Sequence, residues 1–421
     1  MRVVLVVPSF PQVSETFIIS KFLGLLKRGW DVHVVCGTSS PEQLHWFPEL
    51  EQSALARKRV HRVWPVRPKL VGAALVPAAL VSCLASAPAR TALYLWKGIR
   101  LAGSDILRRL YLDYHLIKLR PAVVHFEFGA LAVGRMYLKE LLNCRIVVSF
   151  RGYDLNFSGL EQEDYYSEVW QKADMLHFLG EDLRRRALRR GCPPDRPHML
   201  IPPALDIRRF NPSAQSHTEV LGTENRPLRL LSVGRLEWKK GYEHALQAVR
   251  FLKDRGIKLV YRIVGAGQYI EAVAFCRYQL GLEDCVELLG AMPQEQVLEQ
   301  MKWADVFLHA AVSEGFCNAV LEAQAMKLPV VCSDAGGLPD NVADGVTGFV
   351  VPRRNPKAMA DKLELLAANP ELRRRMGNAG RERVESCFRL EDQIDRFEKL
   401  YLTVLDQERP GMGKGVISGE G

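Results

Sequence analysis

The 421-residue chain lacks the cysteine patterns of zinc proteins. Its nine cysteines are scattered, and neither a CxxC pair nor a Cys/His cluster occurs, which argues against a structural zinc site. The opening apolar stretch Val3–Val7 is too short for a secretory segment and is followed by Pro8. We therefore expect reduced thiols and a cytoplasmic location.

Two motifs that would point to other chemistry are also missing. No Asp-x-Asp sequence follows an expected strand, so we expect no bound metal. Aromatic residues are sparse among the basic ones and no nucleic-acid-binding motif occurs, so we expect no nucleic-acid partner. Apolar residues make up 48% of the chain and charged residues 25%, as in globular proteins in general.

The positive charge is concentrated in one segment. Residues 57–120 contain thirteen Lys or Arg but only two acidic residues, so the remainder of the chain has a net charge of −2. An excess of this kind bears on partners and membranes rather than on the fold. Within the segment, Leu70–Ala89 is a run of 20 residues without a charge.

The length of that run would permit a membrane span. We reject a span because expected strands on both sides of the run should join one sheet, and because Pro77 interrupts it. Two interpretations stay open. The run forms ordinary domain helix, or it lies on the surface of an anionic membrane with Trp64, Tyr94 and Trp96 at the interface.

Short continuous apolar runs alternate with helical patterns along the whole chain, which indicates parallel sheets covered on both faces. The length also exceeds that of one ordinary core. We predict an α/β protein with two doubly wound, Rossmann-like domains facing a cleft, where ligands bind beyond the carboxyl ends of the strands. The predicted parts are an N-terminal domain at 1–205 containing the basic insert at about 57–120, a C-terminal domain at 206–387, a helix at 388–405 that packs back toward the first domain, and a disordered tail at 406–421.

The most informative motif is Ser313-Glu-Gly-Phe-Cys-Asn-Ala-Val-Leu-Glu322. It runs from the end of an expected strand into a helix, so Glu314 lies in the loop and Glu322 on the early helix. The free amides at the helix start, from Gly315 to Asn318, favour an anion. One place thus offers amides for a diphosphate and two carboxylates for sugar hydroxyls, which is what a nucleotide-sugar pocket needs.

A second motif, Ser232-Val-Gly-Arg-Leu-Glu-Trp-Lys-Lys-Gly241, follows the first strand of the second half. Gly234 permits close backbone approach, and Arg235 and Lys240 can straddle a diphosphate. The alternative is a solvated basic turn, and Lys239 is expected to be a surface charge. Gly265 lies in another glycine turn, where a packing role and a ligand role stay open.

These motifs, in order, resemble the retaining family-4 glycosyltransferases, which have the GT-B fold. The matching pieces are Gly234-Arg-Leu-xxx-Lys240-Gly, Ile263-Val-Gly-Ala-Gly267, Val286-Glu-Leu-Leu-Gly290, Ser313 to Glu322, and Gly336-Gly-Leu-Pro339 to Asp344-Gly-Val-Thr-Gly-Phe-Val-Val-Pro352. The resemblance implies that Arg235 and Lys240 hold the diphosphate and that Glu322 binds the ribose. It implies that Glu314 and the amides after it (Gly315, Phe316, Cys317, Asn318) address the donor sugar and the diphosphate. Gly234 and Gly265 are included as candidate donor-binding residues.

The first half resembles the subgroup that builds exopolysaccharide and related surface glycans, through Pro8-Ser-Phe-Pro-Gln-Val-Ser-Glu-Thr-Phe17. Ser14 and Thr16 either donate hydroxyls toward the cleft or cap the following helix, with Ser14 favoured as N-cap. Family members often have a glycine-rich loop here, which this chain lacks.

The chain departs from its relatives at two further places. It has His125-Phe-Glu127-Phe-Gly where they often have His-x-His-Phe-Gly, and Arg151-Gly-Tyr-Asp154 where they often have His-Gly-x-Asp. Arg151 stays protonated and cannot act as a general base, but it could bind a sugar hydroxyl or an acceptor phosphate. We include His125 and Arg151 with Glu314, Arg235 and Lys240 as candidate catalytic residues; His125 and Asp154 have structural alternatives.

The resemblance implies a retaining transfer of a sugar from a nucleotide-diphosphate donor, with UDP mildly preferred over GDP, to a growing glycan; whether that acceptor is lipid-linked stays open. No cofactor is expected. A front-face displacement, in which the leaving phosphate oxygen helps to deprotonate the acceptor, fits the lack of a convincing carboxylate nucleophile. The alternatives are a GT-B epimerase or phosphorylase, and a non-catalytic protein that binds lipid or nucleic acid. The enzyme would be cytoplasmic, and peripheral attachment to the cytoplasmic face of the membrane stays open.

Overall fold

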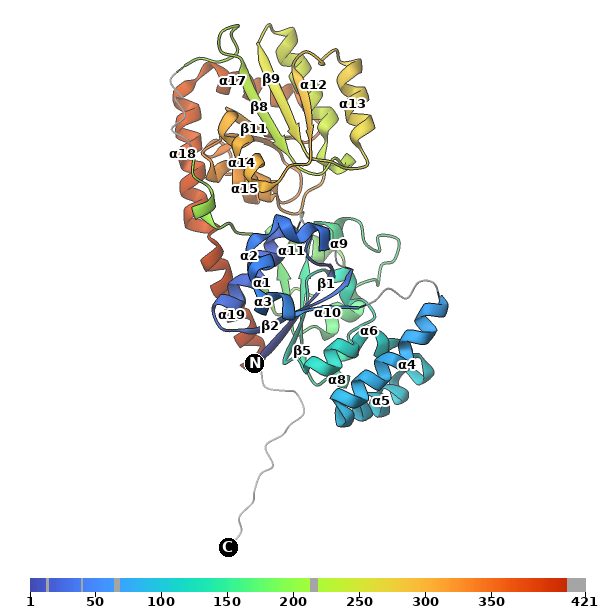
Figure 1. Ribbon diagram of the computed structural model, residues 1–421. Helices are drawn as coiled ribbons and strands as arrows, with labels where there is room; N and C mark the ends of the chain where they lie inside the picture. The colour runs from blue at the N-terminus through green and yellow to red at the C-terminus, as the bar shows by residue number, and fades with distance from the viewer. Residues whose placement is uncertain (13–14, 39–40, 64–68, 213–218, 407–421) are drawn as a thin grey trace.

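The computed structural model describes residues 1–12, 15–38, 41–63, 69–212 and 219–406. It contains two parallel sheets, each with helices on both faces, and the two sheets lie one beyond the other along the long axis of the molecule (Figure 1). This confirms the predicted α/β architecture. The predicted disordered tail lies almost entirely outside the described residues.

The first sheet has seven strands in the order β3-β2-β1-β4-β5-β6-β7, all paired in parallel. The strands are β1 (Arg2–Ser9), β2 (Asp31–Thr38), β3 (Val60–Arg62), β4 (Val123–Phe126), β5 (Arg145–Phe150), β6 (Met175–Phe178) and β7 (His198–Leu200). The central strands are almost wholly buried, as expected when helices cover both faces.

The second sheet has six strands in the order β10-β9-β8-β11-β12-β13. They are β8 (Leu228–Val233), β9 (Leu259–Val264), β10 (Val286–Gly290), β11 (Val306–His309), β12 (Val330–Ser333) and β13 (Gly348–Val351). In both sheets the order reverses beside the first strand, β1 or β8. The carboxyl ends next to that reversal are where such sheets bind ligands.

The helices that position the site are few. They are α1 (Thr16–Lys27), α2 (Pro48–Gln52), α9 (Gly152–Asn156), α14 (Gln294–Trp303) and α15 (Asn318–Ala325). Ser14 lies outside the described residues. The first helix begins at Thr16, with Glu15 in the N-cap position and without a side-chain cap hydrogen bond.

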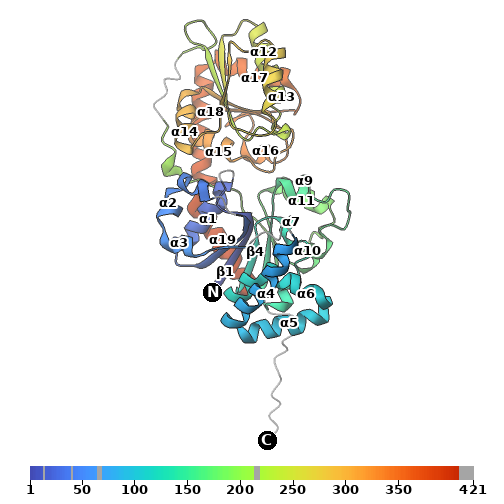
Figure 2. The same cartoon turned by 45° about the vertical axis from the view of Figure 1, so that its right-hand side comes forward.

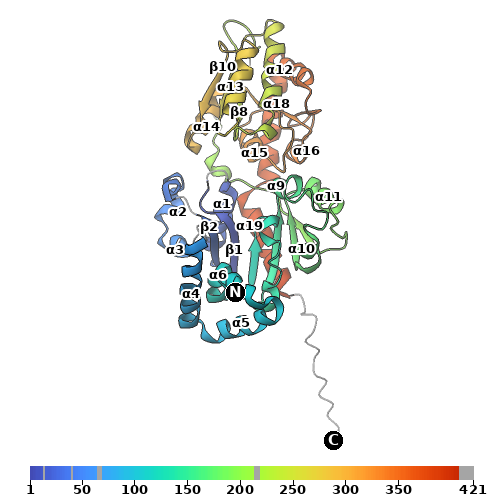
Figure 3. The same cartoon turned by 90° about the vertical axis from the view of Figure 1, so that its right-hand side faces the viewer.

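The basic insert forms three helices that pack on one another around Cys83, Tyr94 and Leu110. They are α4 (Lys69–Ser86), α5 (Pro88–Ala102) and α6 (Ile106–Leu119). Figures 2 and 3 show them at the end of the molecule farthest from the second sheet. Pro77 lies within α4 and does not interrupt it. Among the described helices, none has the length and apolar character needed to cross a membrane.

The end of the chain returns to the first domain. Helix α18 (Pro370–Cys387) packs on the second domain, whereas α19 (Leu390–Asp406) places Ile394, Phe397 and Tyr401 in the core formed by β1 and α1. The chain passes between the domains twice, near Leu205 and near Phe388, and these two segments lie side by side. The Leu205 amide donates to Phe388 O at 2.9 Å, and the Leu390 amide donates to Leu205 O at 2.9 Å.

Candidate active site

The two domains meet through backbone at the carboxyl ends of their sheets. A Cβ added to Gly152 would lie 2.9 Å from Cα of Gly315, so two glycines are needed for this approach. Beside it, Asn156 Nδ2 donates to Ser313 Oγ at 3.0 Å. The start of α9 in the first domain therefore lies directly against the loop between β11 and α15.

Glu314 and Lys240 form an ion pair at this junction, with each side chain only 12% exposed. His309 Nε2 lies 3.4 Å from Glu314 Oε2. Burial alone would raise the pKa of Glu314, but the ammonium of Lys240 and the His309 ring outweigh it and lower that pKa to about 2. The structure thus brings the predicted carboxylate and lysine together as a charged pair.

The expectation of free amides after Glu314 needs a correction. The amide of Gly315 donates to Glu314 Oε1 at 3.3 Å, and that of Cys317 donates to Asn341 Oδ1 at 3.1 Å. A diphosphate would have to displace these partners or use other amides of the loop. The Phe316 ring packs against the cores of both domains, so this side chain contributes to the contact between the domains.

Arg235 and Lys239 both contact Glu237, at 3.0 and 2.6 Å. The Arg235 side chain is 56% exposed and is available to a ligand. Lys239 is 17% exposed, with its ammonium 5.8 Å from the centre of the Phe157 ring of the first domain. The prediction that Lys239 is a surface charge is therefore wrong: it faces the other domain.

The close contact with Gly234 explains why position 265 needs glycine. Gly265 has φ +150°, and a Cβ there would lie 1.9 Å from Gly234 O. The Gly234 oxygen also accepts a hydrogen bond from Tyr242 Oη at 2.9 Å. Of the two roles left open for Gly265, packing is the one that the structure describes, and it holds the Arg235 loop in place.

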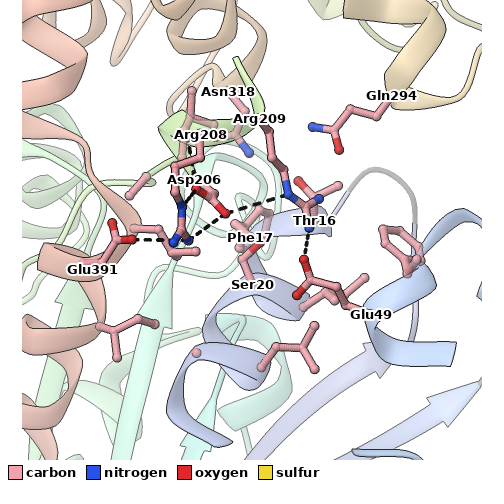
Figure 4. A pocket seen from close by; sticks show the side chains of 18 of the residues that line it. Thr16, Phe17, Ser20, Glu49, Asp206, Arg208, Arg209, Gln294, Asn318 and Glu391 are labelled. Atoms are coloured by element: carbon pink, nitrogen blue, oxygen red, sulfur yellow. Dashed lines mark hydrogen bonds and ion pairs between the residues drawn. The ribbon is translucent and has the colours of Figure 1, made fainter. Parts of the chain in front are cut away.

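Glu322 and Asn318 line a pocket of about 220 Å³ between the domains. Figure 4 shows Thr16 and Asn318 on its walls. Arg208 and Arg209 lie there too, with Asp206 2.8 Å from Arg208 and Arg209 paired to Glu49. Burial raises the pKa of Glu322 to about 7. Glu314 is not among the residues that line this pocket, so the two motif carboxylates do not line one common pocket as the sequence had predicted.

His125 does not face the cleft, which corrects its prediction as a catalytic residue. It is fully buried, with Nδ1 2.8 Å from Tyr401 Oη and Nε2 2.7 Å from Ser149 Oγ. Burial lowers its pKa well below the usual value, so the ring stays neutral. His125 joins the C-terminal helix to the first sheet.

Arg151 lies at the junction between the domains, but its guanidinium is bound by Glu127 of its own domain. Its Nε donates to Glu127 O and its Nη2 to Glu127 Oε2, both at 2.9 Å, and the guanidinium stacks 4.0 Å from the centre of the Phe17 ring. Glu127 also pairs with buried Lys21. Asp154 caps α9 by accepting the amide of Arg151 at 2.9 Å, which is a structural role.

Sequence reasoning missed Lys21 and Asn156. Lys21 is a lone cation on the apolar face of α1. Because a buried lysine needs a charged partner, this position could have predicted an ion pair in the core. Nothing in the sequence marks Asn156, whose partner Ser313 is in the other domain.

His309, Glu314 and Cys317 form the group among the described residues that is suited to a metal, with ligand atoms within 4.8 Å of one another. The Lys240 ammonium already supplies Glu314 with positive charge. A cation bound there would have to displace Lys240 or share its partner.

The comparisons with known proteins define the class. Residues 214–383 match the family of glycosyl transferases group 1. The fold matches the sucrose-phosphate synthase of Thermosynechococcus elongatus, with a TM-score of 0.72, 18% identity, and coverage of 96% of this chain and 99% of that one. It also matches Anabaena HepE in complex with UDP and glucose, with a TM-score of 0.71, 14% identity, and coverage of 96% and 100%. The fold is therefore that of the GT-B glycosyltransferases.

Two curated relatives extend over most of the chain. A putative colanic acid biosynthesis glycosyltransferase, WcaL of Salmonella typhimurium, is 28% identical over 86% of this chain and 90% of its own. The amylovoran biosynthesis glycosyltransferase AmsK of Erwinia amylovora is 25% identical over 86% and 89%. This chain is a glycosyltransferase, and its second domain is a glycosyltransferase group 1 domain.

Proposed function

We propose that the enzyme transfers a sugar from a nucleotide-diphosphate donor to a growing surface glycan, with retention of configuration and without a metal. The observation that carries the proposal is the convergence of Lys240, Glu314 and the start of α15 on the junction between the domains. The names of WcaL and AmsK, both exopolysaccharide enzymes, support the acceptor class.

In this proposal Arg235 and Lys240 hold the diphosphate, whose charge grows as it leaves. Glu314 accepts hydroxyls of the donor sugar, and Glu322 those of the ribose. UDP is preferred over GDP, and the complex of HepE with UDP supports that preference. A front-face displacement suits the site because Glu314, the carboxylate at the junction, is already held by Lys240 and is poorly placed to act as a nucleophile.

The test is release of nucleoside diphosphate from a panel of UDP- and GDP-sugars. Lys240→Ala and Glu322→Ala should each lower kcat/KM by roughly 100-fold or more, since each removes a charged contact to the donor. Glu283→Ala, an exposed carboxylate in the same domain, is the matched control. Full turnover in both site variants would refute the assignment, and a reaction that needs no acceptor would favour an epimerase.

The insert is the proposed membrane contact. Large apolar side chains are exposed along it, including Trp96 (53%) and Ile99 (59%). The Arg100 guanidinium lies 3.8 Å from the centre of the Trp96 ring. A basic, apolar surface of this kind suits an anionic bilayer, where a lipid-linked acceptor would lie.

Co-sedimentation with phosphatidylglycerol vesicles tests this contact. The double variant Trp96→Ser/Ile99→Ser should lose binding, whereas Phe275→Ser/Tyr278→Ser, two comparably exposed residues in the other domain, should not. Equal binding by both double variants would exclude the insert as the contact. Binding that is equally strong to neutral vesicles would exclude an electrostatic contribution to membrane binding.

A further inference from the structure

Three aromatic side chains form a continuous surface across the boundary between the two domains. Tyr153 and Phe157 belong to the region of α9 in the first domain, with their ring centres 5.8 Å apart, and the Phe157 ring lies 5.7 Å from that of Trp238 in the second domain. Tyr153 is 61% exposed and Trp238 is 52% exposed, whereas Phe157 is half-buried. Single exposed apolar side chains are common on proteins, but three neighbouring ones are a candidate binding surface. We call these three side chains the aromatic surface.

The aromatic surface borders the candidate active site. Tyr153 directly follows Gly152, whose backbone lies against that of Gly315. Trp238 lies two residues before Lys240, the lysine of the ion pair at the junction. Figure 2 shows α9 at the end of the first domain that faces the second, away from the helices of the basic insert. The segments that carry the rings are therefore the ones that position the candidate catalytic groups.

Other groups hold the two domains together beside the aromatic surface. The two glycines bring the backbones into contact, and Asn156 Nδ2 donates to Ser313 Oγ at 3.0 Å. More than half of Tyr153 and of Trp238 still faces solvent. Their rings are thus available to a ligand and are not used up in packing between the domains.

The chemistry of the aromatic surface suits a sugar ring. A pyranose presents C–H groups with a partial positive charge on its faces, and the face of an aromatic ring carries the negative part of its quadrupole. The hydroxyls at the edge of the sugar need polar partners, and the Lys239 ammonium lies 5.8 Å from the centre of the Phe157 ring. Tyr and Trp also lose little conformational entropy when they bind, because each has only two side-chain torsions.

The position of the surface favours the acceptor over the donor nucleoside. Glu322, which we assign to the ribose, lines the pocket of about 220 Å³ between the domains, and none of the three aromatic residues lines that pocket. The aromatic surface is therefore a separate place beside the junction, where a glycan chain can extend from the reacting centre.

We propose that Tyr153, Phe157 and Trp238 form a subsite that stacks a sugar ring of the acceptor glycan. This inference rests on the proposed function and adds the acceptor side to it. Because the subsite contains residues of both domains, it is complete only while the domains lie as close together as the Gly152–Gly315 contact places them. Acceptor binding should therefore favour this arrangement of the domains.

The experiment measures sugar binding and nucleotide binding separately. The sugar probes are cellobiose, lactose and methyl α-mannoside, followed by saturation-transfer NMR; UDP and GDP are followed by calorimetry. Trp238→Ala and Tyr153→Ala should each raise the Kd of the best sugar probe by roughly 5-fold to 10-fold, as expected for the loss of one stacked ring. Trp238→Phe keeps an aromatic face and should lose less, whereas Trp238→Leu should resemble Trp238→Ala. Nucleotide affinity and diphosphate release with water as acceptor should change by less than about twofold.

The matched controls are Phe275→Ala and Tyr278→Ala, two comparably exposed aromatic residues elsewhere in the second domain, which should bind the sugars like the unchanged protein. The proposal is overturned if no probe binds the unchanged protein, or if the controls lose as much affinity as the Trp238 and Tyr153 variants. It is also overturned if Trp238→Ala loses nucleotide affinity, since the ring would then stack the donor base. A protein that binds the sugars through these rings but neither binds a nucleotide nor releases diphosphate would retain the subsite and refute the proposed function.

Discussion

Replacing Gly152 by alanine should keep the two domains apart without unfolding either of them. The added Cβ would lie 2.9 Å from both Cα and N of Gly315, whereas carbon atoms pack at about 3.5–4.0 Å. Both partners are backbone, so no side chain can rotate away. The contact must open by roughly 0.6–1.1 Å, which also weakens the bond between Asn156 and Ser313 at 3.0 Å.

A displacement of about 1 Å in an active site can cost roughly 100-fold in rate, and we expect a loss of that size in kcat/KM for diphosphate release. The melting temperature should change little, because Gly152 begins α9 and alanine is the better helix former. Gly315→Ala opens the same contact from the other side, so the double variant should be no worse than the more damaging single one. Glu161→Ala, at an exposed position nearby, serves as control.

Activity of Gly152→Ala within about twofold of the unchanged enzyme would refute this reasoning, since it would mean that turnover does not need the domains this close. Additive losses in the double variant would refute it in another way, by showing that the two glycines act at separate places.

Tyr401→Phe should lower the free energy of unfolding in urea by about 1–3 kcal/mol, because it leaves a buried nitrogen of His125 unpaired, while turnover per folded molecule stays unchanged; a specific loss of kcat would restore a catalytic role for that histidine. Glu314 should make stability depend on pH at the acid end. Because folding lowers its pKa from 4.5 to about 2, its contribution is complete above pH 4.5 and is lost as the pH falls toward 2. In Glu314→Gln, the free energy of unfolding in urea should lack this fall between pH 4.5 and 2. An equally steep dependence on pH in both proteins would count against the ion pair. Gly265→Ala should destabilise the second domain, since its Cβ would meet Gly234 O at 1.9 Å; an unchanged melting temperature would contradict this.

The sequence was sufficient for the elements that carry long apolar runs. The apolar runs predict strands at 145–150, 175–178, 228–233 and 259–264. The strands β5, β6, β8 and β9 begin and end at these residues, because buried parallel strands leave an unbroken apolar pattern. The edge strand β3 was missed since Val60-His-Arg62 has too few apolar residues for such a pattern.

The parts of the site that depend on distant partners could not be predicted. The amide of Cys317 is bound by Asn341, 24 residues further on, and no local rule identifies that partner. His125 lies near the carboxyl end of β4 and was included as a candidate catalytic residue, but its partner Tyr401 lies 276 residues away on α19. Local pattern thus located the loops correctly, whereas the direction of individual side chains was set by packing between remote segments.

The return of α19 to the first domain has a consequence for synthesis. The first domain is synthesised before the second, yet its core lacks Phe397, Leu400 and Val404 until the residues of α19 have emerged from the ribosome. The apolar residues of β1 and α1 that α19 covers therefore stay exposed while the second domain is being made. A nascent chain that is arrested before residue 390 should be bound by chaperones through these residues.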